Sequence, residues 1–226
     1  MKAFKKYLEL KTSPFYKNIK PISKEEYDTL PVWDIEGGIG SRDREEVLKE
    51  ETDSSEDSDE EVHKSFKHSR IPTKDELNSL KHYTDYSHKI NSDSRQGVEN
   101  EHHKHLDSWL DESKSKNDEF LYHGLKKPPV TGKFKTTSYI STSSDKLIAK
   151  CFAKTNKSEN EEFHNKKHVL KIYTPKTSKA ASVKDYSESP EEKEISIHRH
   201  QALEIHPTPT VEGNTVYWHT VLHKNV

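Results

Sequence analysis

Six short stretches in the second half of the chain carry the hydrophobic patterns of β-strands. In several of them apolar and polar residues alternate, which places every second side chain on the same face of a strand. Most are bounded by Pro, Gly, Asn or Ser, residues that commonly end strands. They are EFLYHGL (119–125), KTTSYIST (135–142), HVLKIYT (168–174), EKEISIH (192–198), ALEIHP (202–207) and TVYWHTVLH (215–223). We expect a strand at each position.

Three segments have apolar residues at helical spacing. The first helix should begin after Thr73, because Asp75 and Glu76 place acidic residues in its first turn. Its apolar stripe is Leu77, Leu80, Tyr83 and Ile90; a second helix covers 97–112, with Leu106, Trp109 and Leu110 as anchors, and a third covers 143–154. The order is two helices, two strands, a helix and four strands. That order predicts an α+β fold with a mainly antiparallel sheet.

The first 70 residues have a different character. Residues 50–61, EETDSSEDSDEE, hold eight acidic residues and no basic ones, so this run repels itself and is expected to be disordered. MKAFKKYLEL (1–10) suggests a short amphipathic helix, and GGIG (37–40) is expected to be flexible linker. We therefore expect a flexible amino-terminal segment over 1–70, with an acidic linker, and a folded domain over 71–226.

Composition limits the classes of protein that fit. The chain has 226 residues, of which 29% are hydrophobic and 34% charged, too polar for one packed core along its whole length. The formal net charge of -2 gives no overall basic field for nucleic acid or an anionic membrane. No apolar run approaches the ~20 residues of a membrane span. Cys151 has no cysteine partner, which fits a reducing compartment.

Two further kinds of site are disfavoured. The 15 histidines include the clusters HHKH (102–105) and HRH (198–200). Zinc sites usually add cysteine or carboxylate at regular spacing, so no metal site is expected. The sequence also lacks the Gly-x-Ser-x-Gly elbow of many serine hydrolases.

Glu192 and Glu194 raise a chemical question. They are two positions apart in a predicted strand, so both carboxylates should lie on one face and repel each other. A solvated strand face would tolerate this pair. A site that uses both carboxylates would require it.

Four segments, in order, resemble the motifs of mono-ADP-ribosyltransferases of the arginine-serine-glutamate type, as found in large tailed bacteriophages and related bacterial exotoxins. They are YTDYSHKIN (83–91), LYHGL (121–125), YISTSSDKLIAKCFA (139–153) and EKEISI (192–197). The resemblance covers the carboxyl-terminal ~155 residues. It implies an ADP-ribosyltransferase-like fold, in which amino-terminal helices pack on a mainly antiparallel two-sheet β core.

The resemblance also assigns chemical roles to the carboxylates. In this family the bond between nicotinamide and ribose of NAD, the substrate, is broken through a cation-like ribose. Glu194 would be the catalytic carboxylate that stabilises this cation. Glu192 would pair with an incoming arginine guanidinium and help to take its proton. Ser141 would position Glu194 and contact NAD.

The NAD-binding residues implied by the resemblance are His123, Gly124, Tyr122, Thr142 and Ser143. Gly124 matches a glycine whose backbone meets the nicotinamide amide, and the absence of a Cβ should allow that approach. His123 departs from the family, which has an arginine there. Histidine offers fewer donors and is mostly neutral at pH 7. A related histidine-tyrosine-glutamate branch does use a histidine at this place.

The expected partners are acceptor proteins of a bacterial host, and Tyr186, in the loop before Glu192, is a candidate residue for recognising them. The protein is expected to be a monomer without direct nucleic-acid binding, acting in the host cytoplasm. MKAFKKYLEL loosely resembles the leader of phage internal head proteins, and residues 48–50 loosely resemble a processing site. Packaging in the virion is a hypothesis. Two alternatives stay open: an NAD glycohydrolase, and a non-catalytic protein on the same scaffold.

Overall fold

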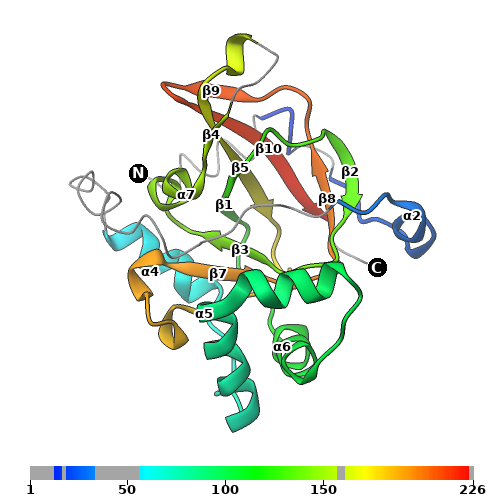
Figure 1. Ribbon diagram of the computed structural model, residues 1–226, viewed down its shortest axis with the longest axis vertical. Coiled ribbons are helices and arrows are strands. Elements are labelled where there is room, and N and C mark those ends of the chain that lie inside the picture. The colour runs from blue at the N-terminus through cyan, green and yellow to red at the C-terminus, as the bar shows by residue number, and fades with distance from the viewer. Residues whose placement is uncertain (1–12, 17–18, 34–55, 157–160, 224–226) are drawn as a thin grey trace.

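The computed structural model describes residues 13–16, 19–33, 56–156 and 161–223 (Figure 1). The predicted helix over 1–10, the GGIG linker, the proposed processing site and residues 50–55 of the acidic run lie outside this part of the chain. The described residues form an α+β fold in which helices surround a mainly antiparallel sheet.

The two longest helices begin with reciprocal caps. In α5, Thr73 accepts a hydrogen bond from the backbone of Glu76, whose carboxylate accepts one from the backbone of Thr73. Asn100 and His103 cap α6 in the same way. The helices are α2 (Lys24–Thr29), α4 (Glu56–Ser65), α5 (Lys74–Arg95), α6 (Glu101–Asp111) and α7 (Lys146–Phe152), with 3-10 turns η1 (Glu161–Phe163), η2 (Lys184–Tyr186) and η3 (Pro190–Glu192). The three predicted helices are thus present, and α5 has one non-helical residue, Tyr86.

The end of the acidic run, which we expected to be disordered, lies in helix α4. Residues 56–61 lie in α4, and the apolar residues after them hold the helix in place. Phe66 is 1% exposed and belongs to the main core, and Val62 packs against the same core. Residues before position 71 therefore pack with residues after it. Burial of these two side chains offsets the cost of ordering an acidic segment.

The strands largely follow the predicted pattern. They are β1 (Glu119–Leu125), β2 (Gly132–Lys135), β3 (Ile140–Ser143), β4 (Thr155–Asn156), β5 (Lys166–Thr174), β6 (Ala180–Ser182), β7 (Glu194–Ile197), β8 (Ala202–Ile205), β9 (Thr210–Glu212) and β10 (Thr215–His223). The bounds of β1 and β10 agree with the sequence pattern. One strand was expected over 135–142. The structure instead has two strands there: residue 135 ends β2, and residues 140–142 belong to β3. The short strands β4, β6 and β9 were not predicted.

Hydrogen bonds join these strands in the order β2-β8-β10-β5-β1-β3-β7-β6, with β4 beside β5 and β9 beside β10. Only the β5–β10 pair is parallel among the described strand pairs. β1 meets β3 through a single residue pair, Tyr122 and Ser143. The sheet therefore consists of two parts joined at one point, and the three strands β3, β7 and β6 form the smaller part.

Helices α5 and α6 lie together beside β7 (Figure 1). Their apolar stripes meet in a core that includes Tyr83, Trp109 and Tyr139. Trp109 is fully buried, and Tyr83 is 1% exposed. These side chains fix α5 over the polar face of β3 and β7.

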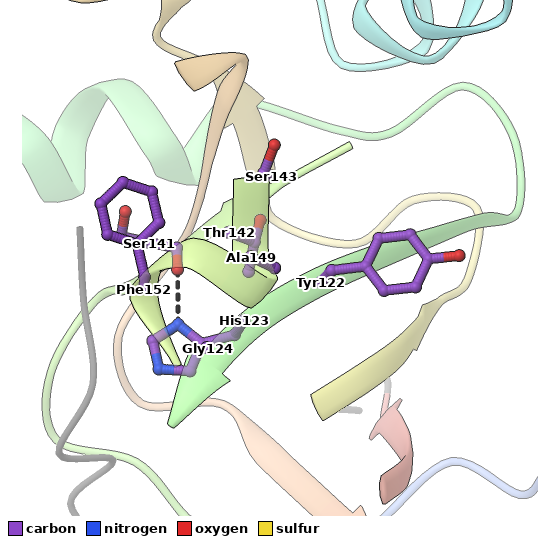
Figure 2. Close-up of a pocket in the computed structure, with 8 residues that line it drawn as sticks. All are labelled: Tyr122, His123, Gly124, Ser141, Thr142, Ser143, Ala149 and Phe152. Atoms are coloured by element: carbon purple, nitrogen blue, oxygen red, sulfur yellow. Dashed lines mark hydrogen bonds between the residues drawn. The ribbon is translucent and has the colours of Figure 1, made fainter. Parts of the chain in front are cut away.

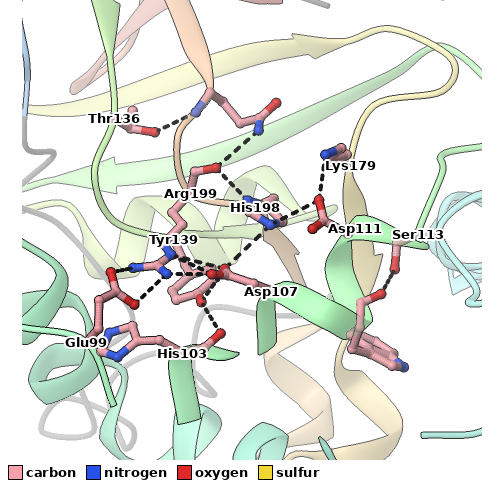
Figure 3. Close-up of polar contacts among 12 residues, drawn as sticks. Glu99, His103, Asp107, Asp111, Ser113, Thr136, Tyr139, Lys179, His198 and Arg199 are labelled. Atoms are coloured by element: carbon pink, nitrogen blue, oxygen red, sulfur yellow. Dashed lines mark hydrogen bonds and ion pairs between the residues drawn. The ribbon is translucent and has the colours of Figure 1, made fainter. Parts of the chain in front are cut away.

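An ion-pair network around the buried Arg199 fastens α6 to the turn after β7 (Figure 3). The guanidinium of Arg199 donates two hydrogen bonds to Glu99, at 2.6 and 2.7 Å, and others to Asp107. It also lies 5.7 Å from the centre of the Tyr139 ring. His198 is 3.5 Å from the carboxylates of Asp107 and Asp111. The carboxyl-terminal end of β7 is therefore held by charge-assisted bonds as well as by its strand neighbours.

Candidate active site

The side chains of Ser141 and Glu194 meet across two adjacent strands. In the antiparallel β3–β7 pair, Ser141 lies opposite Ser196 and Ser143 lies opposite Glu194. Because alternate residues share a face, Ser141 and Glu194 are diagonal neighbours on it. The Ser141 hydroxyl donates a hydrogen bond of 2.5 Å to Glu194 Oε1. The structure thus brings together two residues that are 53 positions apart.

Glu194 is buried, with 4% of its surface exposed. Burial raises the pKa of its carboxyl to about 7, the hydrogen bond from Ser141 opposes this rise, and the negative charge of Glu192 adds to it. The carboxyl therefore keeps its proton to a higher pH than a solvated glutamate does. A catalytic anion at this position must first lose a proton, or its ionised form must be stabilised by a cationic ligand.

Tyr83 of α5 completes the surroundings of this carboxyl. Its hydroxyl is buried, and its pKa is raised by burial and then by the charge of Glu194. From the sequence, Tyr83 was identified only as a member of an apolar stripe and of the first motif. Its contact with the Glu194 site depends on how α5 crosses the sheet, which the helical pattern does not specify.

We expected Glu192 to lie on the strand with Glu194, and this prediction was wrong. It ends the 3-10 turn η3, and β7 begins two residues later at Glu194. Between them Lys193 has a left-handed backbone, with φ of 50°, and its ammonium lies 3.1 Å from Asp145. The two glutamates are therefore not alternate residues on one strand face. They are still close enough for the charge of Glu192 to raise the pKa of Glu194.

His123 on β1 lines a small pocket beside Ser141 (Figure 2). Its Nδ1 donates a 2.6 Å hydrogen bond to the carbonyl oxygen of Ser141. Burial lowers the pKa of His123, so the ring is neutral and its Nε2 is an acceptor. That Nε2 is buried and has no partner within the described part of the chain. A ligand hydroxyl or amide N–H would satisfy it, which is a fit to the ribose or amide of NAD.

The pocket is lined by Tyr122, His123, Gly124, Ser141, Thr142, Ser143, Ala149 and Phe152. All five NAD-site candidates are among these residues. Its volume is about 10 Å³, room for about one water molecule, so NAD enters only if neighbouring segments move apart. Thr142 donates its hydroxyl to Ile195 O at 2.5 Å, and Ser143 donates its own to Glu192 O at 3.0 Å. Both hydroxyls therefore hold the backbone on either side of Glu194.

The structure explains the glycine at position 124 by a contact other than the one we expected. A Cβ at this position would lie 2.3 Å from Ala149 O and 2.6 Å from Ala153 N. These atoms belong to α7 and its carboxyl-terminal cap. The missing Cβ therefore allows α7 to pack closely against β1.

Tyr186 lies at the end of η2, away from the pocket around His123. Its half-buried ring packs edge-on against Trp109, with the ring centres 5.9 Å apart. The structure thus places Tyr186 at the junction of α6 and the loop before Glu192.

Neither a candidate metal site nor a candidate membrane-spanning helix occurs among the described residues. No group of three or more His, Cys, Asp or Glu side chains there is arranged to hold a metal ion. No helix in the same part of the chain has the length and apolar character of a membrane span.

Comparisons with known proteins bear on the family and the fold of the chain. The family model for the ADP-ribosyltransferase exoenzyme matches residues 59–221. Similar solved structures include Plx2a, an ADP-ribosyltransferase toxin from Paenibacillus larvae, with 15% identity, a TM-score of 0.56 and coverage of 80% of this chain and 97% of that chain. C3stau2 from S. aureus, solved with NAD, has 15% identity, a TM-score of 0.55 and coverage of 77% and 98%.

A third similar structure is Vis of Vibrio splendidus in complex with agmatine, with 17% identity, a TM-score of 0.52 and coverage of 82% and 88%. At these identities the three structures establish the fold. No curated protein sequence matches the chain. Because the family model spans most of its length, the chain belongs to the ADP-ribosyltransferase exoenzyme family, whose chemistry is the NAD-dependent transfer of ADP-ribose.

Proposed function

We propose that this protein transfers ADP-ribose from NAD to arginine side chains of proteins in a bacterial host, and releases nicotinamide. The observation that carries the proposal is the buried Glu194 carboxyl, held by the Ser141 hydroxyl, with a second carboxylate close by on η3. This arrangement provides a fixed anion at a developing cation and a separate acceptor for a guanidinium proton.

The roles of the two carboxylates follow from their surroundings. Glu194 is shielded from bulk water, so its anion would stabilise a cationic ribose more strongly than a solvated carboxylate could. As the bond from ribose C1′ to the nicotinamide nitrogen breaks, nicotinamide leaves with the bonding electrons. A guanidinium nitrogen then bonds to C1′ and gives up one proton. Glu192 is half-buried and not held in the sheet, so it suits contact with an incoming acceptor and removal of that proton.

Arginine is the proposed acceptor for two reasons. A carboxylate beside the catalytic anion offers a guanidinium a charge-assisted, two-point hydrogen bond. In addition, the structurally similar Vis was solved with agmatine, a small guanidine compound. Both observations support a guanidine group as the nucleophile for this chain.

Action in the cytoplasm of a phage-infected bacterium is also a proposal, and its support is the motif resemblance to tailed-phage transferases. Packaging of the protein in the virion is proposed because residues 1–10 loosely resemble a phage leader. Mass spectrometry of purified virions tests the packaging proposal. Peptides from this chain in the virion are expected, and their absence would remove the packaging step.

The direct test of activity uses biotin-labelled NAD, a bacterial lysate and agmatine as a small acceptor. The wild-type protein should label host proteins and agmatine, whereas Glu194→Gln should label neither. Release of nicotinamide without labelling of either acceptor would instead identify an NAD glycohydrolase. No NAD turnover, together with no NAD binding in calorimetry, would leave a non-catalytic protein on this scaffold.

A further inference from the structure

A second cleft opens on the side of β6 and β7 where α4 lies. Its volume is about 320 Å³, within the ~300–1,000 Å³ range of ligand-binding clefts. It is lined by α4, the segment that links α4 to α5, and the start of the loop before Glu192. The lining residues are Glu60, His63, Lys64, Lys67, His68, Ser69, Arg70, Ile71, Ser182, Lys184, Asp185 and Tyr186. None of them lines the pocket around His123.

The cleft is directly coupled to the catalytic strand. Ser182 pairs with Ile195 in the β6–β7 ladder, and the next residue, Val183, donates its N–H to Glu194 O at 3.1 Å. On the other wall, His63 lies 2.8 Å from the Ser182 hydroxyl. A molecule in this cleft is therefore next to the strand that carries the catalytic carboxyl. The rest of the same molecule could extend along the loop toward Glu192.

The charges of the cleft favour an anionic partner. Four cationic side chains line it against two carboxylates, although the chain as a whole has a net charge of -2. Arg70 is neutralised by Glu76 and Glu112, at 2.7 and 2.6 Å. Among the described residues Lys67 has no ion-pair partner, and Lys64 reaches only Glu60, at 4.0 Å. Lys67 is thus available to a ligand, whereas Lys64 and Lys184 share the exposed Glu60 in weak pairs, at 4.0 and 3.9 Å, that a ligand can replace.

An exposed apolar side chain also lines the cleft. Ile71 is 88% exposed, the largest exposure among the large hydrophobic residues that the structure describes. Exposed aliphatic groups beside cations fit a polypeptide that carries both acidic and hydrophobic side chains. Nucleic acid fits less well, because Glu60 and Asp185 would face its phosphates.

We propose that this cleft docks an acidic segment of the acceptor protein, one that carries a hydrophobic side chain for Ile71. The proposal rests on the function proposed above and adds the chemistry of the partner. Docking at the cleft would raise the local concentration of the acceptor arginine at Glu194. A small acceptor such as agmatine has no segment to dock and would not depend on the cleft.

The test compares two double variants with the same change in net charge. Lys64→Glu with Lys67→Glu reverses the charge of the cleft. Lys20→Glu with Lys24→Glu is the control, at exposed positions at and just before α2, on the opposite side of the molecule from α4 (Figure 1). The cleft variant should label lysate proteins about tenfold less than the control, while both label agmatine within about twofold of wild type. Equal labelling of lysate proteins by the two variants would overturn the proposal.

A binding experiment separates this inference from the catalytic one. A short fluorescein-labelled glutamate peptide with one central leucine is titrated with each protein, and its anisotropy is measured. Wild type and the control should bind it, more weakly at high salt, and the cleft variant should bind about tenfold more weakly. Equal binding by all three proteins would refute the cleft even if NAD turnover is present. Stronger competition by a DNA oligonucleotide than by unlabelled peptide would also refute it. Absence of NAD turnover in wild type would refute the catalytic proposal alone.

Discussion

The substitution Glu194→Gln should stabilise the folded protein at alkaline pH while abolishing ADP-ribose transfer. The fold raises the pKa of the Glu194 carboxyl from 4.5 to about 7. Each unit corresponds to ~1.36 kcal/mol, so ionising this carboxyl costs the folded state about 3 kcal/mol relative to the unfolded chain. Glutamine has nearly the same shape and can still accept the Ser141 hydroxyl. It avoids the cost because it carries no charge.

The pH dependence of this effect has a definite sign. Between pH 4.5 and 7 the folded protein keeps the Glu194 proton more tightly than the unfolded chain does, so wild-type stability falls as pH rises. The stability contributed by this group is fully present below pH 4.5 and is lost as pH passes about 7. The variant lacks this dependence. The difference in unfolding free energy between variant and wild type should therefore grow by about 2 kcal/mol from about pH 5.5 to about pH 8.5.

Urea unfolding followed by tryptophan fluorescence measures this difference. Glu191→Gln is the matched control, because Glu191 is an exposed carboxylate three positions before Glu194 and its solvation changes little on folding. Its stability relative to wild type should not vary with pH. A Glu194→Gln difference that is also constant between pH 5.5 and 8.5 would refute the reasoning, because it would mean that the buried carboxyl is ionised without cost.

Three other substitutions test neighbouring parts of the structure. Ser141→Ala removes the donor to Glu194, so the pKa of that carboxyl should rise and the pH profile of NAD turnover should shift to higher pH. An unshifted profile would contradict this role. Gly124→Ala forces a Cβ against Ala149 O, and overpacking of this kind lowers the free energy of unfolding by about 1–3 kcal/mol. The Tm should therefore fall. An unchanged Tm would contradict the close packing of α7 against β1. Arg199→Met should lower the free energy of unfolding by about 1.5–3 kcal/mol in urea titrations, since it removes the charge-assisted hydrogen bonds from the buried guanidinium to the half-buried Asp107 and the exposed Glu99. A loss below about 1 kcal/mol would contradict this.

The sequence predicts best those features that depend on local patterns. The bounds of β1 and β10 follow from hydrophobic runs of the right length, and the start of α5 follows from the acidic residues of its first turn. The pairing of Ser141 with Glu194 was implied by a family resemblance, and no local pattern carries it. β6 has three residues, too few for a periodic signal, although it pairs with β7.

Other features depend on tertiary contacts that the sequence does not show. Disorder was expected over residues 56–61 because of their charge, but the buried Phe66 a few residues later anchors the helix that contains them. Gly124 was assigned to contact with NAD because it lies in a motif. The structure adds a packing reason that the motif does not show, because α7 lies directly against this position of β1. For residues 56–61 the order depends on Phe66, an apolar side chain whose packing partners cannot be identified from the pattern. For Gly124 the close packing depends on α7, which is distant in sequence.

The placement of the two glutamates has a consequence for acceptor choice. Glu194 is fixed by strand pairing and by the Ser141 hydroxyl, whereas Glu192 is positioned by a 3-10 turn and one left-handed residue, Lys193. The Lys193 ammonium lies 3.1 Å from the Asp145 carboxylate. A rigid anion suits the ribose, which reaches the same position with every substrate. A carboxylate on a turn can adjust to acceptors of different shape, so changes in the loop before β7 should alter which protein is modified while leaving NAD cleavage intact.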